Sequence, residues 1–176
     1  MTRIESIPSG RAAELRLAFD QSFADPIQEV SRDTVDFISL SLAGDAHAIL
    51  TADIAGLFVD VKVTPCPSPL AELRGIAGFR GTLTPVYDLG ALLGYPMSSG
   101  RWLVLAKGGA LAFAFDGFDG HFRVEYAAIA THEGTSSARH VHEIARQAER
   151  AWPVIDIPSA LRAIKARAAA SPQKEH

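Results

Sequence analysis

The segment spanning residues 73–93 constrains the fold most strongly, because turn residues, a strand pattern and a helix start follow one another within it. Gly75, Gly78 and Gly81 lie within seven residues, and glycines so closely spaced predict tight turns or a close approach of the backbone. Residues 82–88 then alternate as strand residues do, and the proline among them favours an edge or a bulge. The segment therefore predicts a turn-rich β unit that leads into a helix.

A Pro-Val-x-Asp motif occurs twice in the chain, ending at Asp88 and at Asp156. An apolar stretch follows each aspartate, at 89–93 and at 158–170, and we interpret the two aspartates as helix caps rather than as a catalytic pair. The segments upstream of the two motifs also resemble each other, at 48–58 and at 112–122. An internal repeat of this kind predicts two small β-barrels packed together with exchanged strands.

Alternating or continuous apolar residues predict short strands along most of the chain. The predicted strands cover residues 37–42, 47–51, 54–63, 101–107, 110–115, 122–126 and 151–157. Residues 141–148 fit a strand and a short helix almost equally well. We expect an N-terminal extension over 1–34, a mostly β domain over 35–170 and a disordered tail over 171–176. A helix predicted at 11–23 is either a satellite of the core or an arm that a partner orders.

The composition restricts the class of protein. The net charge is −3 and the pI is about 6.0, so the charge gives no electrostatic basis for binding nucleic acid or an anionic membrane. Cys66 is the only cysteine, which excludes an internal disulfide. The N-terminal sequence has no signal-peptide pattern, and no stretch reaches the ~18 apolar residues of a membrane span. We therefore expect a cytoplasmic protein without direct membrane insertion.

The motif R-G-x-x-x-P-V-x-D-L, from Arg80 to Leu89, follows a proline-rich loop at 64–69. It resembles the central motif of the CheW-like domain of bacterial chemotaxis, and the resemblance extends over about residues 35–166. The resemblance implies a mostly β fold of two intertwined five-stranded SH3-like β-barrels, here with an N-terminal and a C-terminal helix. It further implies a non-enzymatic adaptor without a cofactor. One face of such an adaptor binds a CheA-type histidine kinase, and a groove between the barrels binds the helical hairpin tip of methyl-accepting chemoreceptors.

The resemblance also assigns roles to residues around the glycines. Arg80 corresponds to the family's arginine beside the receptor groove, and Gly75 and Gly81 shape its loop. Phe79 stands in the place of a leucine of the family and is a further candidate contact. A guanidinium carries five hydrogen-bond donors, so Arg80 suits two roles: contact with a partner, or hydrogen bonds to loop carbonyls that hold the turn.

Ile54 and Leu57 match apolar positions in a region that the family uses in partner binding. Gly56, which lies between them, replaces an acidic residue of the family pattern. This departure and the N-terminal extension favour a second hypothesis, in which the chain is a diverged scaffold or sensor of another signalling system without the usual receptor. A third hypothesis is that the chain is an enzyme, but the sequence offers no set of titratable residues that would form an active site.

Histidine and cysteine residues give no strong indication of a chemical site. His140 and His142 would point to the same side of a strand, as a zinc pair requires. No third ligand stands at metal spacing, so we interpret them as solvated surface residues. Cys66 lies between two prolines, with no base arranged to activate it. We therefore predict no catalytic residue and no metal site.

Overall fold

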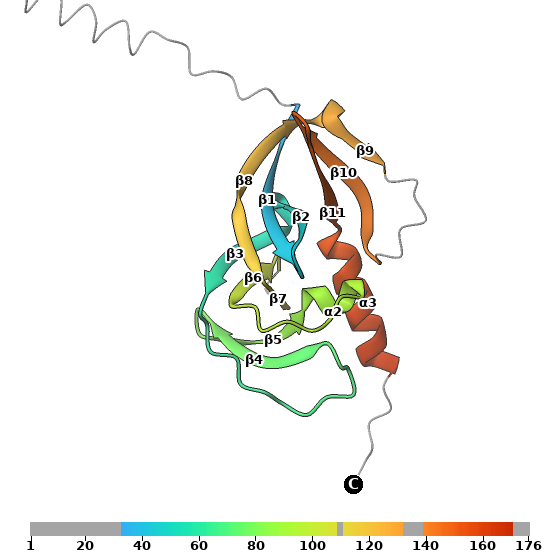
Figure 1. The fold of residues 1–176 in the computed structure, drawn as a ribbon. Helices are drawn as coiled ribbons and strands as arrows, with labels where there is room; N and C mark the ends of the chain where they lie inside the picture. Colours follow the sequence, from blue (N-terminus) through green and yellow to red (C-terminus); the bar gives the residue numbers. More distant parts are fainter. Residues whose placement is uncertain (1–32, 109–110, 132–138, 171–176) are drawn as a thin grey trace, which may run out of the picture. The chain divides into compact units, whose positions relative to one another are not determined.

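The computed structural model describes residues 33–108, 111–131 and 139–170. The helix predicted at 11–23 and the tail predicted at 171–176 lie outside these described residues. Two β-sheets account for most of the described part, which confirms the prediction of a mostly β fold (Figure 1).

Sheet A has six strands and sheet B has five. Sheet A follows the order β8 (Gly117–Glu125), β1 (Thr34–Leu42), β2 (Asp45–Leu50), β11 (Arg150–Ile155), β10 (Val141–Gln147) and β9 (Ile129–Thr131). Sheet B follows the order β3 (Ile54–Val59), β6 (Trp102–Ala106), β7 (Ala112–Phe115), β5 (Thr82–Asp88) and β4 (Leu73–Phe79). The helices are α2 (Leu89–Leu93) and α3 (Ile157–Ala170). Residues 141–148 thus form a strand, and β9 adds a sixth strand to a unit predicted to have five.

The two sheets exchange hairpins, as the internal repeat suggested. In sheet A, β2 pairs in parallel with β11, with Ala48 opposite Val154. In sheet B, β7 pairs in parallel with β5, with Ala112 opposite Val86. These two pairs are related by the sequence repeat, and each joins a strand of the first half of the chain to a strand of the second half. Neither sheet can therefore form from one half alone.

Three apolar clusters bury both faces of each sheet. The central core lies between the sheets and contains residues of both, among them Leu40 and Ile49 of sheet A and Phe113 of sheet B. The sheet A core is formed by Phe37, Ala48, Val124, Ala145, Trp152 and Val154. The sheet B core is formed by Ala77, Phe79, Val86, Leu103, Leu105, Ala112 and Ala114. Burial on both faces explains why β6 and β7 are almost continuously apolar.

The two repeated aspartates cap helices, as predicted. Oδ1 of Asp88 accepts a hydrogen bond from the Ala91 N–H (2.9 Å), and Oδ1 of Asp156 accepts one from the Ser159 N–H (2.8 Å). Each carboxylate satisfies a backbone donor that the first turn of the helix leaves free. Helix α3 begins at Ile157, one residue earlier than expected, and α3 runs down beside sheet B in Figure 1.

The structure differs from the local predictions in three places. Gly81 lies in a turn and Gly75 at a close backbone approach, as predicted, but Gly78 does neither and lies inside β4, which pairs with β5. Strand β3 ends at Val59 rather than at residue 63, since the next residue adopts a left-handed conformation with φ 56°. The strand predicted at 122–126 begins earlier, because β8 starts at Gly117 and pairs with β1 through a bulge.

Gly75 is required by a close approach of two backbone segments. It adopts φ 145°, and a Cβ atom at this position would lie 2.1 Å from the carbonyl oxygen of Thr64. Thr64 and Ile76 exchange two backbone hydrogen bonds of 2.8 Å at this contact. The glycine therefore lets the proline-rich segment join the edge of β4.

We expect Gly75→Ala to lower the free energy of unfolding by about 2–4 kcal/mol, because the methyl group adds a steric clash to an unfavourable φ. Gly78→Ala is the matched control, since a Cβ there meets no atom within 4 Å and φ is ordinary. Its stability should stay the same or rise by up to about 1 kcal/mol. Urea unfolding of both variants checks the prediction, and equal stabilities would contradict it.

Candidate functional site

Arg80 and Gly81 form the two-residue turn between β4 and β5. Phe79 pairs with Thr82 across the hairpin, and the two residues between them have φ 48° and φ 85°. Positive φ at both central positions defines a type I′ turn, whose twist matches that of the flanking strands. The predicted role of Gly81 in shaping the arginine loop thus has a geometric basis, and Arg80 itself adopts a conformation that costs a residue with a side chain about 1–2 kcal/mol.

The side chain of Arg80 is exposed and makes no hydrogen bond or ion pair with any residue that the structure describes. The turn between β1 and β2 offers a comparison, since Ala43 and Gly44 also have φ values of 50° and 92°. There the Ala43 N–H is tied to Oδ2 of Asp116 at 2.7 Å. The turn at Arg80 has no such bond within the described chain.

The side chain of Phe79, next to the Arg80 turn, is buried in the core under the β4–β5 hairpin. It is 4% exposed and belongs to the sheet B core. Its ring meets that of Phe58 on β3 edge-on, with centroids 4.9 Å apart. Strands β3 and β4 are the two outer strands of sheet B, so this contact joins side chains from opposite edges of the sheet. The side chain of Phe79 therefore fixes the turn and presents little surface of its own.

Ile54 and Leu57 lie on β3 and face away from Phe79. Both are partly buried and pack against the central core, whereas Phe58 faces the sheet B core. A bulge between Ile54 and Gly56 lets Ile54 and Leu57, three residues apart, lie on the same face. The structure thus places these two candidates at the margin of the central core, on a different face of sheet B from Phe79.

Gly56 accommodates the ring of Phe58. A Cβ atom on Gly56 would lie 3.0 Å from Cε2 of Phe58. An acidic side chain here would meet the aromatic ring, so the absence of the family's acid and the presence of this phenylalanine are linked by packing. The sequence alone did not reveal this link.

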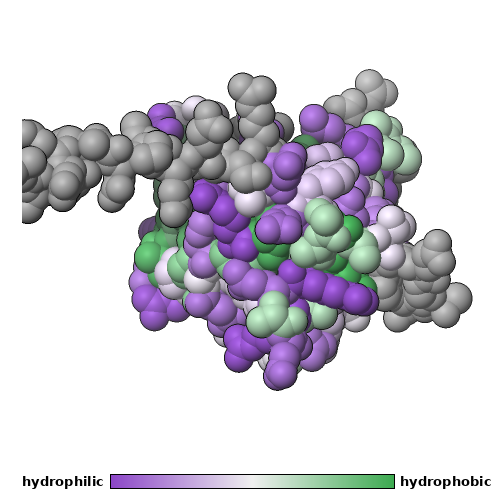
Figure 2. Space-filling view, turned by 90° about the horizontal axis from the view of Figure 1, so that it is seen from above, coloured by the Kyte–Doolittle hydropathy of each residue, from purple (hydrophilic) through white to green (hydrophobic). Residues whose placement is uncertain are grey.

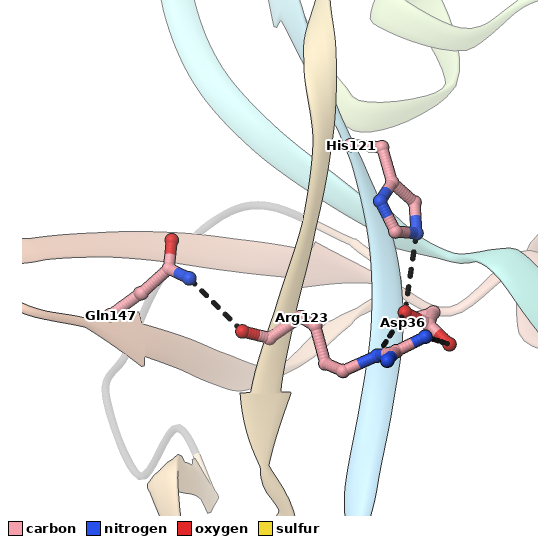
Figure 3. Close-up of polar contacts among 4 residues, drawn as sticks. All are labelled: Asp36, His121, Arg123 and Gln147. Atoms are coloured by element: carbon pink, nitrogen blue, oxygen red, sulfur yellow. Dashed lines mark hydrogen bonds and ion pairs between the residues drawn. The ribbon is translucent and has the colours of Figure 1, made fainter. Parts of the chain in front are cut away.

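A polar network joins three strands of sheet A, as Figure 3 shows. Arg123 on β8 donates from Nε and Nη2 to the carboxylate of Asp36 on β1, at 2.7 and 3.1 Å. His121 Nε2 lies 3.2 Å from the same carboxylate, and Gln147 on β10 donates to the Arg123 carbonyl at 3.0 Å. The Arg123 guanidinium holds the pKa of Asp36 below its usual range. Asp36 and Arg123 are direct cross-strand partners in the β1–β8 pair, so their ion pair adds one contact to this pairing.

A second cluster links β2 to the loop after α2. His47 Nδ1 donates to the Asp45 carbonyl at 3.1 Å, and the Tyr95 hydroxyl donates to Oδ2 of Asp45 at 3.0 Å. The Tyr95 ring meets the His47 ring edge-on. His47 is 3% exposed, and burial lowers the pKa of its imidazole. About 50 residues separate Tyr95 from the other two residues, and no motif in the sequence predicted the cluster.

Two titratable groups near the start of α3, Asp156 and His140, contact the first turn of the helix. A shallow pocket of about 200 Å³ is lined by Leu50, Asp53, His142, Glu143, Val154, Ile155 and Asp156. Asp156 is engaged as a helix cap, and His140 Nδ1 lies 2.9 Å from the Ser159 hydroxyl. Burial raises the pKa of Asp53, with a smaller contribution from Asp156. Among the residues that the structure describes, no three histidine, cysteine, aspartate or glutamate side chains are placed to hold a metal ion.

Figure 2 shows one face of the molecule, on which apolar residues form small groups separated by polar ones. Among the large apolar side chains that the structure describes, Leu83 at 77% and Tyr126 at 71% have the largest exposed fractions. Leu83 follows the Arg80 turn directly. None of the helices in the described ranges has the length and apolar character needed to cross a bilayer.

The comparisons with known proteins agree with this architecture. Residues 36–165 match the sequence model of a family described as the CheW-like domain. A crystal structure of the scaffolding protein TtCheW from Thermoanaerobacter tengcongensis superposes with a TM-score of 0.62 at 20% sequence identity. The superposition covers 69% of this chain and 88% of that chain, and at this identity it establishes the fold alone. A search of curated proteins finds no significant match.

We expect Arg80→Asn to raise the free energy of unfolding by up to about 1 kcal/mol. Asparagine is favoured at the first central position of a type I′ turn, whereas arginine is not. Chemical unfolding of the variant distinguishes the two roles predicted for Arg80, contact with a partner and stabilisation of the turn. A lower stability would show that the arginine holds the turn.

The stability of the fold should decrease as the pH falls below about 6.5, where an unfolded histidine takes up a proton. Burial lowers the pKa of His47 in the folded state, so the unfolded chain binds the proton first and is favoured. His140, whose pKa is also lowered by burial, contributes in the same direction. His47→Gln should make this pH dependence shallower, as measured by urea unfolding between pH 5 and 8. An unchanged slope in the variant would contradict the assignment.

Proposed function

This chain belongs to the CheW-like domain family, and from that premise we propose that it is a non-enzymatic cytoplasmic adaptor in chemotaxis-like signal transduction. In this role it couples methyl-accepting chemoreceptors to a CheA-type histidine kinase. The observation that carries the proposal is Arg80, a cation displayed on a rigid two-residue turn with no partner among the described residues. A fixed and unpaired guanidinium is suited to recognise a carboxylate or a carbonyl of another protein.

The mechanism that we propose is geometric. The hairpin that carries Arg80 and the edge strand β3, with Ile54 and Leu57, offer separate surfaces on sheet B. An adaptor with two such surfaces can hold two proteins at once, and the state of one then changes the placement of the other. The rigid central core between the sheets would transmit such a change, because a packed core deforms little.

The proposal includes the finer fold, in which each sheet closes into an SH3-like β-barrel. Two contacts support closure of sheet B: the rings of Phe58 and Phe79 meet across its two outer strands, and Thr64 bonds to Ile76 on the edge of β4. In sheet A, Phe122 on the outer strand β8 stacks on Trp152 of β11, with ring centroids 4.4 Å apart. These contacts support the proposal that each sheet encloses a core of its own.

The second candidate function is a diverged CheW-like scaffold or sensor that lacks the usual receptor partner. Gly56 and Phe58 favour it, because an aromatic ring occupies the space into which the family's acidic side chain would project. A partner that pairs with that acid would lose this contact. Partner binding experiments distinguish the two candidates.

We expect the purified protein to bind a signalling-tip fragment of a chemoreceptor and the regulatory domain of a CheA-type kinase from the same organism. Arg80→Ala should weaken receptor binding about tenfold or more, since loss of a charge-assisted hydrogen bond costs about 1.5–3 kcal/mol. Titration calorimetry measures both affinities.

Arg150→Ala is the matched control, because Arg150 flanks the hairpin turn between β10 and β11, which the repeat relates to the turn at Arg80. This variant should bind both partners as the wild type does. Binding of neither partner by folded wild-type protein would contradict the coupling role and favour the diverged scaffold.

A further inference from the structure

His47 is a buried ionisable residue at the contact between sheet A and the loop that follows α2. It is 3% exposed and lies two residues before Ile49 on β2, so both side chains face the central core. Tyr95, from the loop, packs against the same core and meets the imidazole edge-on, with ring centroids 5.7 Å apart. Gly94 and Pro96, on either side of Tyr95, are exposed. The tyrosine therefore lies at the surface, against a histidine that is buried behind it.

The hydrogen bonds of this cluster leave one ring nitrogen without a close partner. His47 Nδ1 lies 3.1 Å from the Asp45 carbonyl oxygen, which only accepts, so Nδ1 carries the proton of the neutral ring. The Tyr95 hydroxyl lies 3.0 Å from Oδ2 of Asp45 and directs its single proton to that carboxylate. Nε2 faces the Tyr95 oxygen at 3.5 Å, which is long for a hydrogen bond. The site therefore suits a neutral imidazole and gives a second N–H no acceptor at normal distance.

Few charged groups face the imidazole. Burial lowers the pKa of His47, and this effect exceeds the opposing attraction of Asp45 on the same strand. On β1 the residue opposite His47 is Leu40, and on β11 the residue paired with the next position of β2 is Val154. Helix α2 contains no charged residue. The imidazole thus takes up a proton more readily when Tyr95 moves away and water reaches the ring.

The loop that carries Tyr95 is tied separately to α2. The Tyr95 N–H donates to the Gly90 carbonyl at 2.9 Å, and the Ser98 N–H donates to Oδ2 of Asp88 at 3.2 Å. These acceptors lie in α2 and in its capping residue. Only the side chain of Tyr95, through Asp45 and the imidazole, makes the contacts described above with β2. The side chain can therefore leave sheet A while the backbone of the loop stays bonded to α2.

We propose that His47 and Tyr95 form a pH-sensitive latch between sheet A and the loop after α2. Above about pH 6.5 the imidazole is neutral and the latch is closed. At lower pH, protonation favours the open form, because a charged imidazole requires hydration and the closed site does not satisfy its second N–H. Opening changes the surface beside α2 without unfolding either sheet. An adaptor with such a latch offers a partner a different surface in acid, whichever partner it binds.

Nuclear magnetic resonance of the full-length protein tests the latch. We expect His47 to titrate below pH 6.5, and the nuclear Overhauser effects between its ring and that of Tyr95 to weaken as it does. The ratio of open to closed protein should rise by up to about tenfold per pH unit below about pH 6.5, since one proton is bound on opening. The amide of Phe113, in the central core, should stay protected from exchange over the same range, which separates local opening from unfolding.

Three variants make the test specific. His47→Gln removes the titrating group, so the signals of Tyr95 should not change between pH 5 and 8. Tyr95→Ala uncovers the imidazole, and the pKa of His47 should rise towards about 6.5. His121→Gln is the matched control, because His121 is an exposed histidine that lies beside Asp36. The titration of Tyr95 in this variant should match that of the wild type, and urea unfolding at pH 7.5 shows that each variant is folded.

The outcomes that would overturn the latch do not involve partner binding, so the proposed function is tested separately. An imidazole that titrates at or above pH 6.5 in the wild type would remove the driving force. Ring contacts of Tyr95 that stay constant down to pH 5 would show that protonation opens nothing. A change that persists in His47→Gln and disappears in Asp45→Asn would assign the effect to the carboxylate instead.

Discussion

The reciprocal parallel pairing of β2 with β11 and of β7 with β5 is the constraint on which the rest of the structure depends. Each pair joins one half of the chain to the other, so the long-range contacts of both sheets must form together. Parallel pairing of distant strands carries a high loop-closure entropy. The three apolar cores offset this entropy, because the exchange of hairpins buries both faces of each sheet.

The exchange of hairpins between the two sheets also determines where the candidate site lies. The strand that enters the parallel pair in sheet B is β5, whose buried Asp88 caps α2 at one end. The other end of β5 begins at the Arg80 turn. The hairpin is thus anchored in the central core at its base and supported by Phe79 near its tip. The backbone of the turn is therefore held in place by packing and strand pairing, whereas the Arg80 side chain is exposed and makes no bond within the described chain.

Sequence analysis predicted the features that depend on local chemistry or on the repeat. The capping roles of Asp88 and Asp156, the exchange of strands and the family followed from motifs that recur or match a known pattern. It failed where the determining contact is distant in sequence. The role of Gly75 depends on Thr64, and the burial of His47 depends on Tyr95. Neither of these pairs has a spacing that distinguishes it from chance neighbours, so only the fold could reveal them.

The β4–β5 hairpin combines residues that stability alone would not select. Arginine occupies a left-handed position where asparagine costs less, and Gly78 occupies a strand position that would accept a side chain. Leu83 exposes most of its surface to water. The turn at Ala43 shows that the backbone geometry is common to hairpins of this fold, so geometry does not explain the choice of side chains. Three unfavourable choices on one face are accounted for together if another protein covers that face, because burial in a complex offsets the cost of each of them.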